Sequence, residues 1–191
     1  MAGQQLLQQE QKEKFVKYVK AGWVNVGAAR MCVLDIAGAF YGIRKSFCGL
    51  LGPVEKTVMY TAGEAGATTF VKETLKTGVI PVSAEGFKLC VEAYIQSGFG
   101  NFKVEELDFE NATALISGEY AFEAWAWMQH EDRPRAGVCD YTRGTFLAYM
   151  KVLTDRDDLA CVETECQASG SECCKFLVAP KDHLRQQGYV V

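Results

Sequence analysis

The chain has 191 residues, of which 49% are hydrophobic and 23% charged, so it has enough apolar side chains for one folded core and is not a disordered chain. Its formal net charge of -4 at pH 7 gives no general attraction to nucleic acid or to anionic membranes. No apolar run approaches the roughly 20 residues of a membrane span, and the polar N-terminus lacks the pattern of a secretory signal, so we expect a cytoplasmic protein.

The N-terminal segment is predicted to be helical. Apolar residues recur at helical spacing among Gln, Glu and Lys over residues 4–19. We assign residues 1–22 to this helix, which is a candidate dimer element, and residues 23–191 to a single domain.

A strand and two helices are predicted next. Residues 30–36 have the apolar composition and the length of a strand, and residues 37–51 repeat apolar side chains at helical spacing up to Gly52-Pro53. Pro53 suits the first turn of a second helix, which we expect to continue over residues 54–75.

Small residues interrupt this second helix. Gly63, Gly66 and Ala67 fall within its length, and each glycine lowers helix stability by up to about 1 kcal/mol relative to alanine. We expect the close approach of another helix to compensate, in preference to a bound ligand. Ser83 is placed as the N-cap of a further helix that ends at Gly98.

The period of the apolar residues changes after Gly100. Short alternating runs predict strands, with a turn at Glu110-Asn111 and a hairpin turn at residues 169–172. The predicted strands cover residues 102–107, 113–117, 120–128, 159–168 and 174–178, and a predicted helix covers residues 139–153. The fold class is therefore α+β, with helices packed on a mainly antiparallel sheet.

Cysteines are concentrated towards the C-terminus. The chain has 8 cysteines, and without an export signal such a number predicts metal binding or core filling rather than disulfides. Five of them lie in the last third of the chain: Cys139, Cys161, Cys166, Cys173 and Cys174. Cys139 begins the predicted helix, where free N–H groups favour a thiolate. Cys166 and Cys174 flank the hairpin turn, which brings distant positions together.

We take Cys139, Glu163, Cys166 and Cys174 as the candidate metal ligands. On an ideal strand Glu163 and Cys166 face opposite sides, so the strand must twist, bulge or end between them. Glu165 or Cys161 is an alternative to Glu163, and thiols that simply fill a core are the plainer interpretation. An all-cysteine set with Cys161 or Cys173 would suit an iron–sulfur cluster, whereas the carboxylate favours zinc.

The C-terminal pattern resembles a known family. The stretch Cys139-Asp140-Tyr141-Thr142-Arg143-Gly144 and the stretch from Cys161 to Phe176 are similar to the end of the 4-vinyl reductase domain family. That family has a cysteine before a glycine-containing helix, then Glu-x-x-Cys, a glycine turn and Cys-x-Phe. Residues 60–66 resemble its helical glycine segment, although the second glycine comes one place early, and residues 98–104 resemble its helix-to-strand junction. The similarity runs from Arg30 to Val178.

The resemblance implies a ligand-binding module with the fold of the vesicle-tethering TRAPP subunits. The family includes sensor domains of aromatic-responsive transcription regulators, hydrocarbon-binding proteins and a protein of bacteriochlorophyll synthesis. In the sensors a zinc ion held by Cys, Glu, Cys and Cys supports a buried aromatic pocket, and by motif these ligands correspond to Cys139, Glu163, Cys166 and Cys174. Such a zinc ion is structural, because four protein ligands leave no coordination position for water.

No catalytic residue is predicted. His130 lies in a charged loop and His183 near the C-terminus, and neither lies beside a nucleophile motif. Gly98-Phe99-Gly100 lacks the third glycine of a dinucleotide site. We favour a sensor, carrier or delivery protein for a small hydrophobic or aromatic molecule, which would act through a homodimer or a protein partner. The alternatives are a reductase or tetrapyrrole-biosynthesis accessory with an iron–sulfur centre, and a protein-interaction scaffold.

Candidates for the ligand pocket come from this chain's own aromatic residues, because the family's pocket residues do not carry over. They are Tyr60, Phe99, Phe102, Tyr120, Phe122, Trp125 and Trp127. For any one of them an aromatic core is the simpler interpretation. Glu123 lies among them, and if it is buried it must be paired or have a raised pKa.

Overall fold

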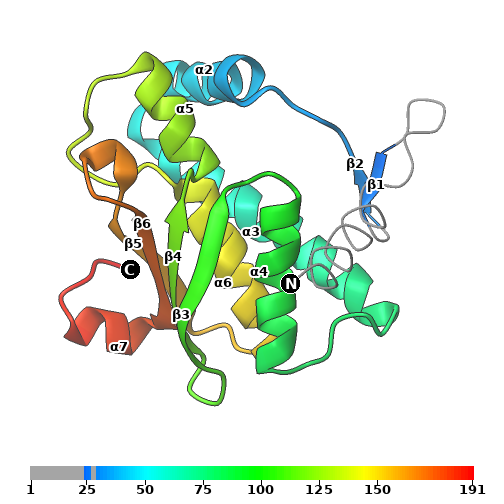
Figure 1. Cartoon of the computed structure of the whole chain (residues 1–191). Coiled ribbons are helices and arrows are strands. Elements are labelled where there is room, and N and C mark those ends of the chain that lie inside the picture. The colour runs from blue at the N-terminus through cyan, green and yellow to red at the C-terminus, as the bar shows by residue number, and fades with distance from the viewer. Residues whose placement is uncertain (1–23, 27–28) are drawn as a thin grey trace, which may run out of the picture. The chain divides into compact units, whose positions relative to one another are not determined.

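The computed structural model describes residues 24–26 and 29–191 (Figure 1). The chain divides into two units, residues 1–34 and residues 35–191, and each is described by itself. In the first unit, strands β1 (Val24–Val26) and β2 (Ala29–Met31) form an antiparallel hairpin. The helix predicted over residues 4–19 lies outside the described residues.

The strand predicted over residues 30–36 is wrong beyond its first two residues. Strand β2 ends at Met31, and Ile36 already begins a helical turn. Asp35 sets where that turn begins, because its side chain accepts a hydrogen bond of 2.7 Å from the Gly38 N–H and so caps it. Side-chain capping of this kind favours a helical start that apolar composition alone does not indicate.

The second unit begins with the predicted helices. The π-helical turn η1 (Ile36–Phe40) leads into α2 (Tyr41–Leu51), and a 3-10 turn η2 (Gly52–Val54) leads into α3 (Glu55–Lys76). Helix α4 (Ala84–Gln96) has Ser83 as its N-cap, and the hydroxyl of Ser83 accepts a bond of 3.3 Å from the Gly86 N–H. The helices expected over residues 37–51, 54–75 and from Ser83 onward are therefore confirmed.

A four-stranded sheet forms the other layer of this unit (Figure 1). Its strands are β3 (Asn101–Asp108), β4 (Thr113–Glu119), β5 (Leu159–Glu165) and β6 (Cys174–Pro180). The order is β3-β4-β6-β5, and every neighbouring pair is antiparallel. The predicted fold class, helices packed on an antiparallel sheet, is confirmed.

The strand predicted over residues 120–128 is wrong, because this segment is helix α5 (Phe122–His130). The extended chain ends at Tyr120, whose φ of 56° is in the left-handed region. Phe122 then donates its N–H to the Phe99 carbonyl at 2.9 Å, which places the start of the helix. Short apolar runs do not distinguish a strand from a buried helix by their spacing alone.

Helix α6 (Asp140–Thr154) follows, as predicted, and crosses α3 at close range. A Cβ atom on Gly63 would lie 2.1 Å from the Tyr141 carbonyl oxygen, and one on Gly144 would lie 2.0 Å from the Tyr60 carbonyl oxygen. Only glycine lets the two backbones come this near. The expected helix contact at Gly63 is therefore confirmed.

The core lies between the helices and one face of the sheet. Its largest fully buried side chains include Phe87, Phe146 and Phe176. The short helix α7 (Lys181–Gln186), which was not predicted, packs Leu184 with Ala160 and Val162 in a second, smaller cluster. Among the described residues, no helix is both long and apolar enough to cross a membrane.

Candidate metal centre and aromatic cluster

Four side chains meet where the start of α6 faces the β5–β6 hairpin. They are Cys139, Glu163, Cys166 and Cys174, and one ligand atom of each lies within 4.8 Å of all the others. The Sγ atoms of Cys139 and Cys174 are 3.8 Å apart. That is roughly the edge of a tetrahedron of thiolates about 2.3 Å from a central zinc ion. The four residues therefore lie close enough to hold one metal ion.

Local backbone structure explains how Glu163 and Cys166 reach the same point. The β5–β6 pairing shifts register between Glu163 and Glu165, and β5 ends at Glu165, so Cys166 is already outside the strand. The bulge and the strand end together remove the alternation that would place the two side chains on opposite faces. Cys174 is the first residue of β6. The 3-10 turn η3 (Gln167–Ser169) begins the connection between the strands.

The Glu163 carboxylate is held by the chain that leads into α6. Its Oε2 atom accepts a bond of 2.9 Å from the Cys139 N–H. A Cβ atom on Gly137 would lie 2.1 Å from the same oxygen, so glycine is needed for this approach. The other oxygen, Oε1, is buried and has no hydrogen-bond partner within the described part of the chain. A buried carboxylate oxygen without a hydrogen-bond partner is suited to binding a cation.

The ionisation of the four donor side chains depends on a cation. Burial raises the pKa of Glu163 to about 8 and holds the pKa of Cys139 well above its usual range. Hydrogen bonds from the Cys139 and Cys174 thiols lower the pKa of Cys166. Four acidic groups in one buried place ionise together only when a positive ion offsets their charge, and three thiolates with one carboxylate form a donor set that zinc accepts.

The alternative ligands lie outside this group of four. Glu165 forms an ion pair of 2.8 Å with Lys175. Cys161 is buried and donates its N–H to the Tyr60 hydroxyl at 3.3 Å, and burial raises the pKa of its thiol to about 12. Cys173 is half-buried next to Cys174. None of the three belongs to the cluster that could bind a metal.

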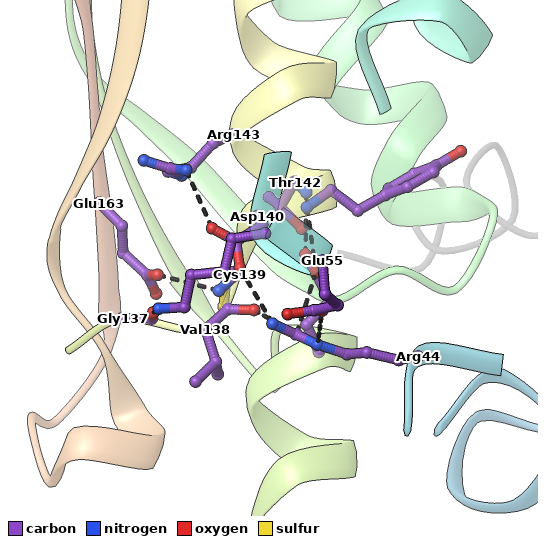
Figure 2. A network of polar contacts seen from close by, with 12 residues as sticks. Arg44, Glu55, Gly137, Val138, Cys139, Asp140, Thr142, Arg143 and Glu163 are labelled. Atoms are coloured by element: carbon purple, nitrogen blue, oxygen red, sulfur yellow. Dashed lines mark hydrogen bonds and ion pairs between the residues drawn. The ribbon is translucent and has the colours of Figure 1, made fainter. Parts of the chain in front are cut away.

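A buried ionic network adjoins the four donors (Figure 2). Its centre is Arg44 of α2, which is 4% exposed. The Arg44 Nε atom lies 2.6 Å from Glu55 Oε1, and its Nη2 atom lies 2.9 Å from Asp140 Oδ2. Its Nη1 atom donates to the Val138 carbonyl oxygen. The network therefore joins α2, the start of α3 and the start of α6.

Glu123 is the third carboxylate of this network. It is 1% exposed, and its oxygens accept the N–H groups of Tyr141 and Thr142 at 3.0 and 2.8 Å. Its Oε1 atom also lies 3.5 Å from Arg44 Nη1. Burial, opposed by Arg44, raises the pKa of Glu123 to about 7. From the sequence, a buried Glu123 had to be paired or to have a raised pKa, and in the structure it is paired and its pKa is raised.

Three of the pocket candidates belong to one aromatic cluster around Tyr94. Phe99 stacks on Tyr94 with ring centroids 4.2 Å apart, and Phe102 lies 5.4 Å from the same ring. Phe122 contacts Phe99 edge to face at 5.1 Å. The Tyr94 hydroxyl lies 3.2 Å from Thr142 Oγ1, so this cluster has a polar point inside it.

The other four candidates are not part of these ring contacts. Tyr60 is half-buried on α3, with the Arg143 guanidinium over its ring at 5.0 Å. Tyr120 and Trp125 are 69% and 38% exposed. Trp127 donates its indole N–H to the Asp132 carbonyl at 2.9 Å and faces Arg44. The structure thus brings three of the seven candidates into ring contact, whereas Tyr60 and Trp127 only border the same core and Tyr120 and Trp125 are exposed.

A groove of about 510 Å³ lies between α2, the start of α3 and the end of α5. The residues that line it are Tyr41, Arg44, Lys45, Cys48, Gly52, Pro53, Glu55, Lys56, Trp127 and Glu131. Trp127 is the one pocket candidate among them. Sequence reasoning missed the groove and the role of Arg44 because the residues come from three separate helices and the turns next to them, and no spacing pattern links them.

The two histidines make structural contacts. His130 stacks on Tyr41 with centroids 4.1 Å apart, and its Nε2 atom lies 2.8 Å from the Ala37 carbonyl oxygen. His183 lies on α7, where its Nε2 atom is 3.0 Å from the Gln187 amide nitrogen.

Solved structures share this fold. The phenol-responsive sensory domain of the transcription activator PoxR, solved with phenol, aligns with a TM-score of 0.78 at 17% identity, over 94% of this chain and 93% of that chain. A vinyl-4-reductase family protein from Methanocaldococcus jannaschii aligns with a TM-score of 0.54 at 16% identity, over 78% of this chain and 83% of that chain.

The chain has the fold of the 4-vinyl reductase domains. Trafficking protein particle complex subunit 3 from Naegleria fowleri, covalently bound to palmitic acid, shares it with a TM-score of 0.56 at 10% identity, over 74% of this chain and 90% of that chain. The 4-vinyl reductase resemblance and the TRAPP-like fold expected from the sequence are confirmed at the level of the fold. No protein-family profile and no curated protein sequence matches the chain significantly.

Proposed function

We propose that this chain, with its 4-vinyl reductase type of fold, is a zinc-stabilised binding module for a small hydrophobic or aromatic molecule and serves as a sensor, carrier or delivery protein. The observation that carries the proposal is the likeness to a domain solved with phenol, which extends over 94% of the chain. At 17% identity this likeness is one of fold. The ligand class and the metal therefore rest on the chain's own aromatic cluster and donor set.

The donor set supports zinc as the ion. Three thiolates and one carboxylate suit a borderline-soft divalent ion and complete a tetrahedral site. When bound, zinc would supply positive charge and bonds that tie the start of α6 to the β5–β6 hairpin. Since four protein ligands leave no open position, the chain's residues would hold the ion for stability and not for hydrolysis. Visible absorption would instead indicate the alternative, an iron–sulfur centre.

The aromatic cluster supports a ligand of aromatic or hydrophobic class. A small-molecule site needs apolar walls and a few polar groups that orient the ligand. Phe99, Phe102 and Phe122 supply the walls, and the Tyr94–Thr142 hydroxyl pair is a polar point between them. The hydroxyl of Thr145, one helical turn beyond Thr142, is buried without a hydrogen-bond partner among the described residues. We propose that the ligand contacts these phenylalanines, and the alternative contacts are the other four aromatic candidates, Tyr60, Tyr120, Trp125 and Trp127.

Titration with phenol tests the ligand class. We expect saturable binding by isothermal titration calorimetry, and we expect Phe99→Leu to weaken it several-fold, because an aromatic contact contributes about 0.5–1.5 kcal/mol beyond its buried area. Phe99 is half-buried, so this change should leave the fold intact. Trp125→Leu is the comparison variant, since Trp125 is 38% exposed. Weaker binding in Trp125→Leu alone would move the site to the exposed aromatic residues.

Native mass spectrometry of protein purified from its own host tests metal, ligand and subunit number together. We propose a cytoplasmic homodimer that uses residues 1–22, or a protein partner, for its output, and a mass of two chains would support the dimer. A spectrum with one zinc ion and one small molecule per chain would support the binding module. Protein that never carries a small molecule, from the host or after titration, would favour an interaction scaffold.

A further inference from the structure

The proposed metal ligand Cys139 lies in the sequence between two residues that both accept hydrogen bonds from one arginine of another helix. Arg44 Nη1 donates to the carbonyl oxygen of Val138, the residue before Cys139. Arg44 Nη2 donates to Asp140, the residue after it, at 2.9 Å. Figure 2 shows the guanidinium facing this turn of the chain, with Glu163 on the other side of Cys139. The Cys139 backbone is thus fixed by Arg44 from one side and by Glu163 from the other.

Arg44 is also the residue that α2 buries against the rest of its unit. It is the only buried residue of α2, whereas Leu50 of the same helix is 81% exposed. The contact of α2 with the rest of its unit therefore depends on a guanidinium and its hydrogen bonds to an unusual degree. A planar fork of donors is required there, because the guanidinium reaches Glu55, Val138 and Asp140 at once.

The carboxylates around Arg44 show that its charge is needed. Glu55, Glu123 and Asp140 are all buried, and Arg44 is the single buried cation among them. Arg143 adds a second, partly exposed cation at 2.9 Å from Asp140. Removing the partner of a buried carboxylate is strongly destabilising. The network therefore fixes the position of the turn before α6 and also balances the charge of the carboxylates there.

We infer that Arg44 is a positioning residue for the metal ligand Cys139, and that it couples the docking of α2 to metal binding. The inference rests on the proposed metal centre. Groups that orient a ligand in this way typically change metal affinity by about 10–100-fold when they are replaced. Coupling of this kind is reciprocal, so a bound metal ion must also strengthen the attachment of α2.

Zinc competition with a chromophoric chelator tests the inference. In Arg44→Lys the charge is kept, but one ammonium cannot replace the fork that bonds Val138 and Asp140 together. We expect a dissociation constant for zinc at least about tenfold higher than in the wild type. We also expect the thiolate-to-metal charge-transfer band of the cobalt-loaded variant to shift, because the geometry at Cys139 changes.

Two control variants separate positioning from general destabilisation. Lys45→Met removes the neighbouring cation of α2, whose side chain is 59% exposed and pairs with Glu131 outside the network, so zinc affinity should stay within about threefold of the wild type, a change below 1 kcal/mol. Val71→Ala removes core volume at a fully buried position outside the network and should lower stability while it leaves zinc affinity and the cobalt spectrum unchanged.

The outcomes are distinct. If Arg44→Lys does not fold, the double variant Arg44→Met/Glu55→Gln, which keeps the net charge of the buried network, is titrated in its place and should show the same loss of affinity. Wild-type affinity in a folded Arg44 variant, or an equal loss in Val71→Ala, would overturn the inference while the metal centre stands. A wild-type protein that binds no zinc would overturn both.

Discussion

Glu123 is a buried carboxylate that shares one arginine with two other acids. Burial, with Arg44 opposing it and Asp140 adding to it, raises its pKa from 4.5 to about 7. The folded protein therefore binds a proton at Glu123 over a range of pH in which the unfolded chain has released it. Stability that depends on this group is complete below the unfolded pKa and falls as the pH rises towards the folded pKa.

Glu123→Gln should remove this pH dependence. Between about pH 5 and pH 7 the free energy of unfolding of the wild type should fall relative to that of the variant by up to about 1.4 kcal/mol per pH unit. Denaturant unfolding of the two proteins at several pH values measures the difference. A difference that is flat, or that grows in favour of the wild type with rising pH, would show that Glu123 is ionised throughout.

Residue chemistry shows how far the sequence could predict the site. The four donors could be proposed from the spacing of Cys139, Glu163, Cys166 and Cys174, and the bulge that aligns two of them is a local backbone feature. Arg44 could not be proposed, because it stands on α2 between Ile43 and Lys45 like a surface residue. Its partners lie from 11 to 96 positions away, and only tertiary packing brings them together.

At the level of secondary-structure elements, the crossing of α3 and α6 depends on two glycines, Gly63 and Gly144. Gly144→Ala places a Cβ atom 2.0 Å from the Tyr60 carbonyl oxygen, so the helices must separate. We expect a loss of about 1–3 kcal/mol in the free energy of unfolding. Chemical denaturation measures it.

The matched control is Gly49→Ala in α2, where a new Cβ atom meets nothing within 4 Å. This variant should gain up to about 1 kcal/mol from helix propensity alone. Equal gains in both variants would mean that the backbones of α3 and α6 are not in close contact.

Helices and strands with a long apolar periodicity could be predicted from the sequence, whereas elements whose type is set by a turn could not. The helices around Gly63 and Phe146 follow from spacing, and the strands β3 and β4 follow from alternation. Helix α5 was predicted as a strand because Phe122, Ala124 and Ala126 alternate and are indeed buried. The left-handed turn at Tyr120 decides between the two, and its residue type gives no signal for it.

Metal removal should loosen the whole second unit. The proposed ion ties the start of α6 to the β5–β6 hairpin, two segments that otherwise meet through the core and through the hydrogen bond from the Cys139 N–H to Glu163. A ligand present at 100 times its dissociation constant stabilises by about 2.7 kcal/mol, which corresponds to roughly 5–10 °C in melting temperature for a domain of this size. Differential scanning calorimetry before and after exhaustive chelation measures the shift. A melting temperature that chelation leaves unchanged would indicate that the ion carries no folding energy.

The most direct measurement of the central claim is the zinc content of three purified proteins by inductively coupled plasma mass spectrometry. The wild type should carry one zinc ion per chain, Cys174→Ser should carry far less, and Cys173→Ser, changed at the neighbouring half-buried thiol, should carry one. Wild-type protein without stoichiometric zinc, or equal metal in the two serine variants, would contradict the account.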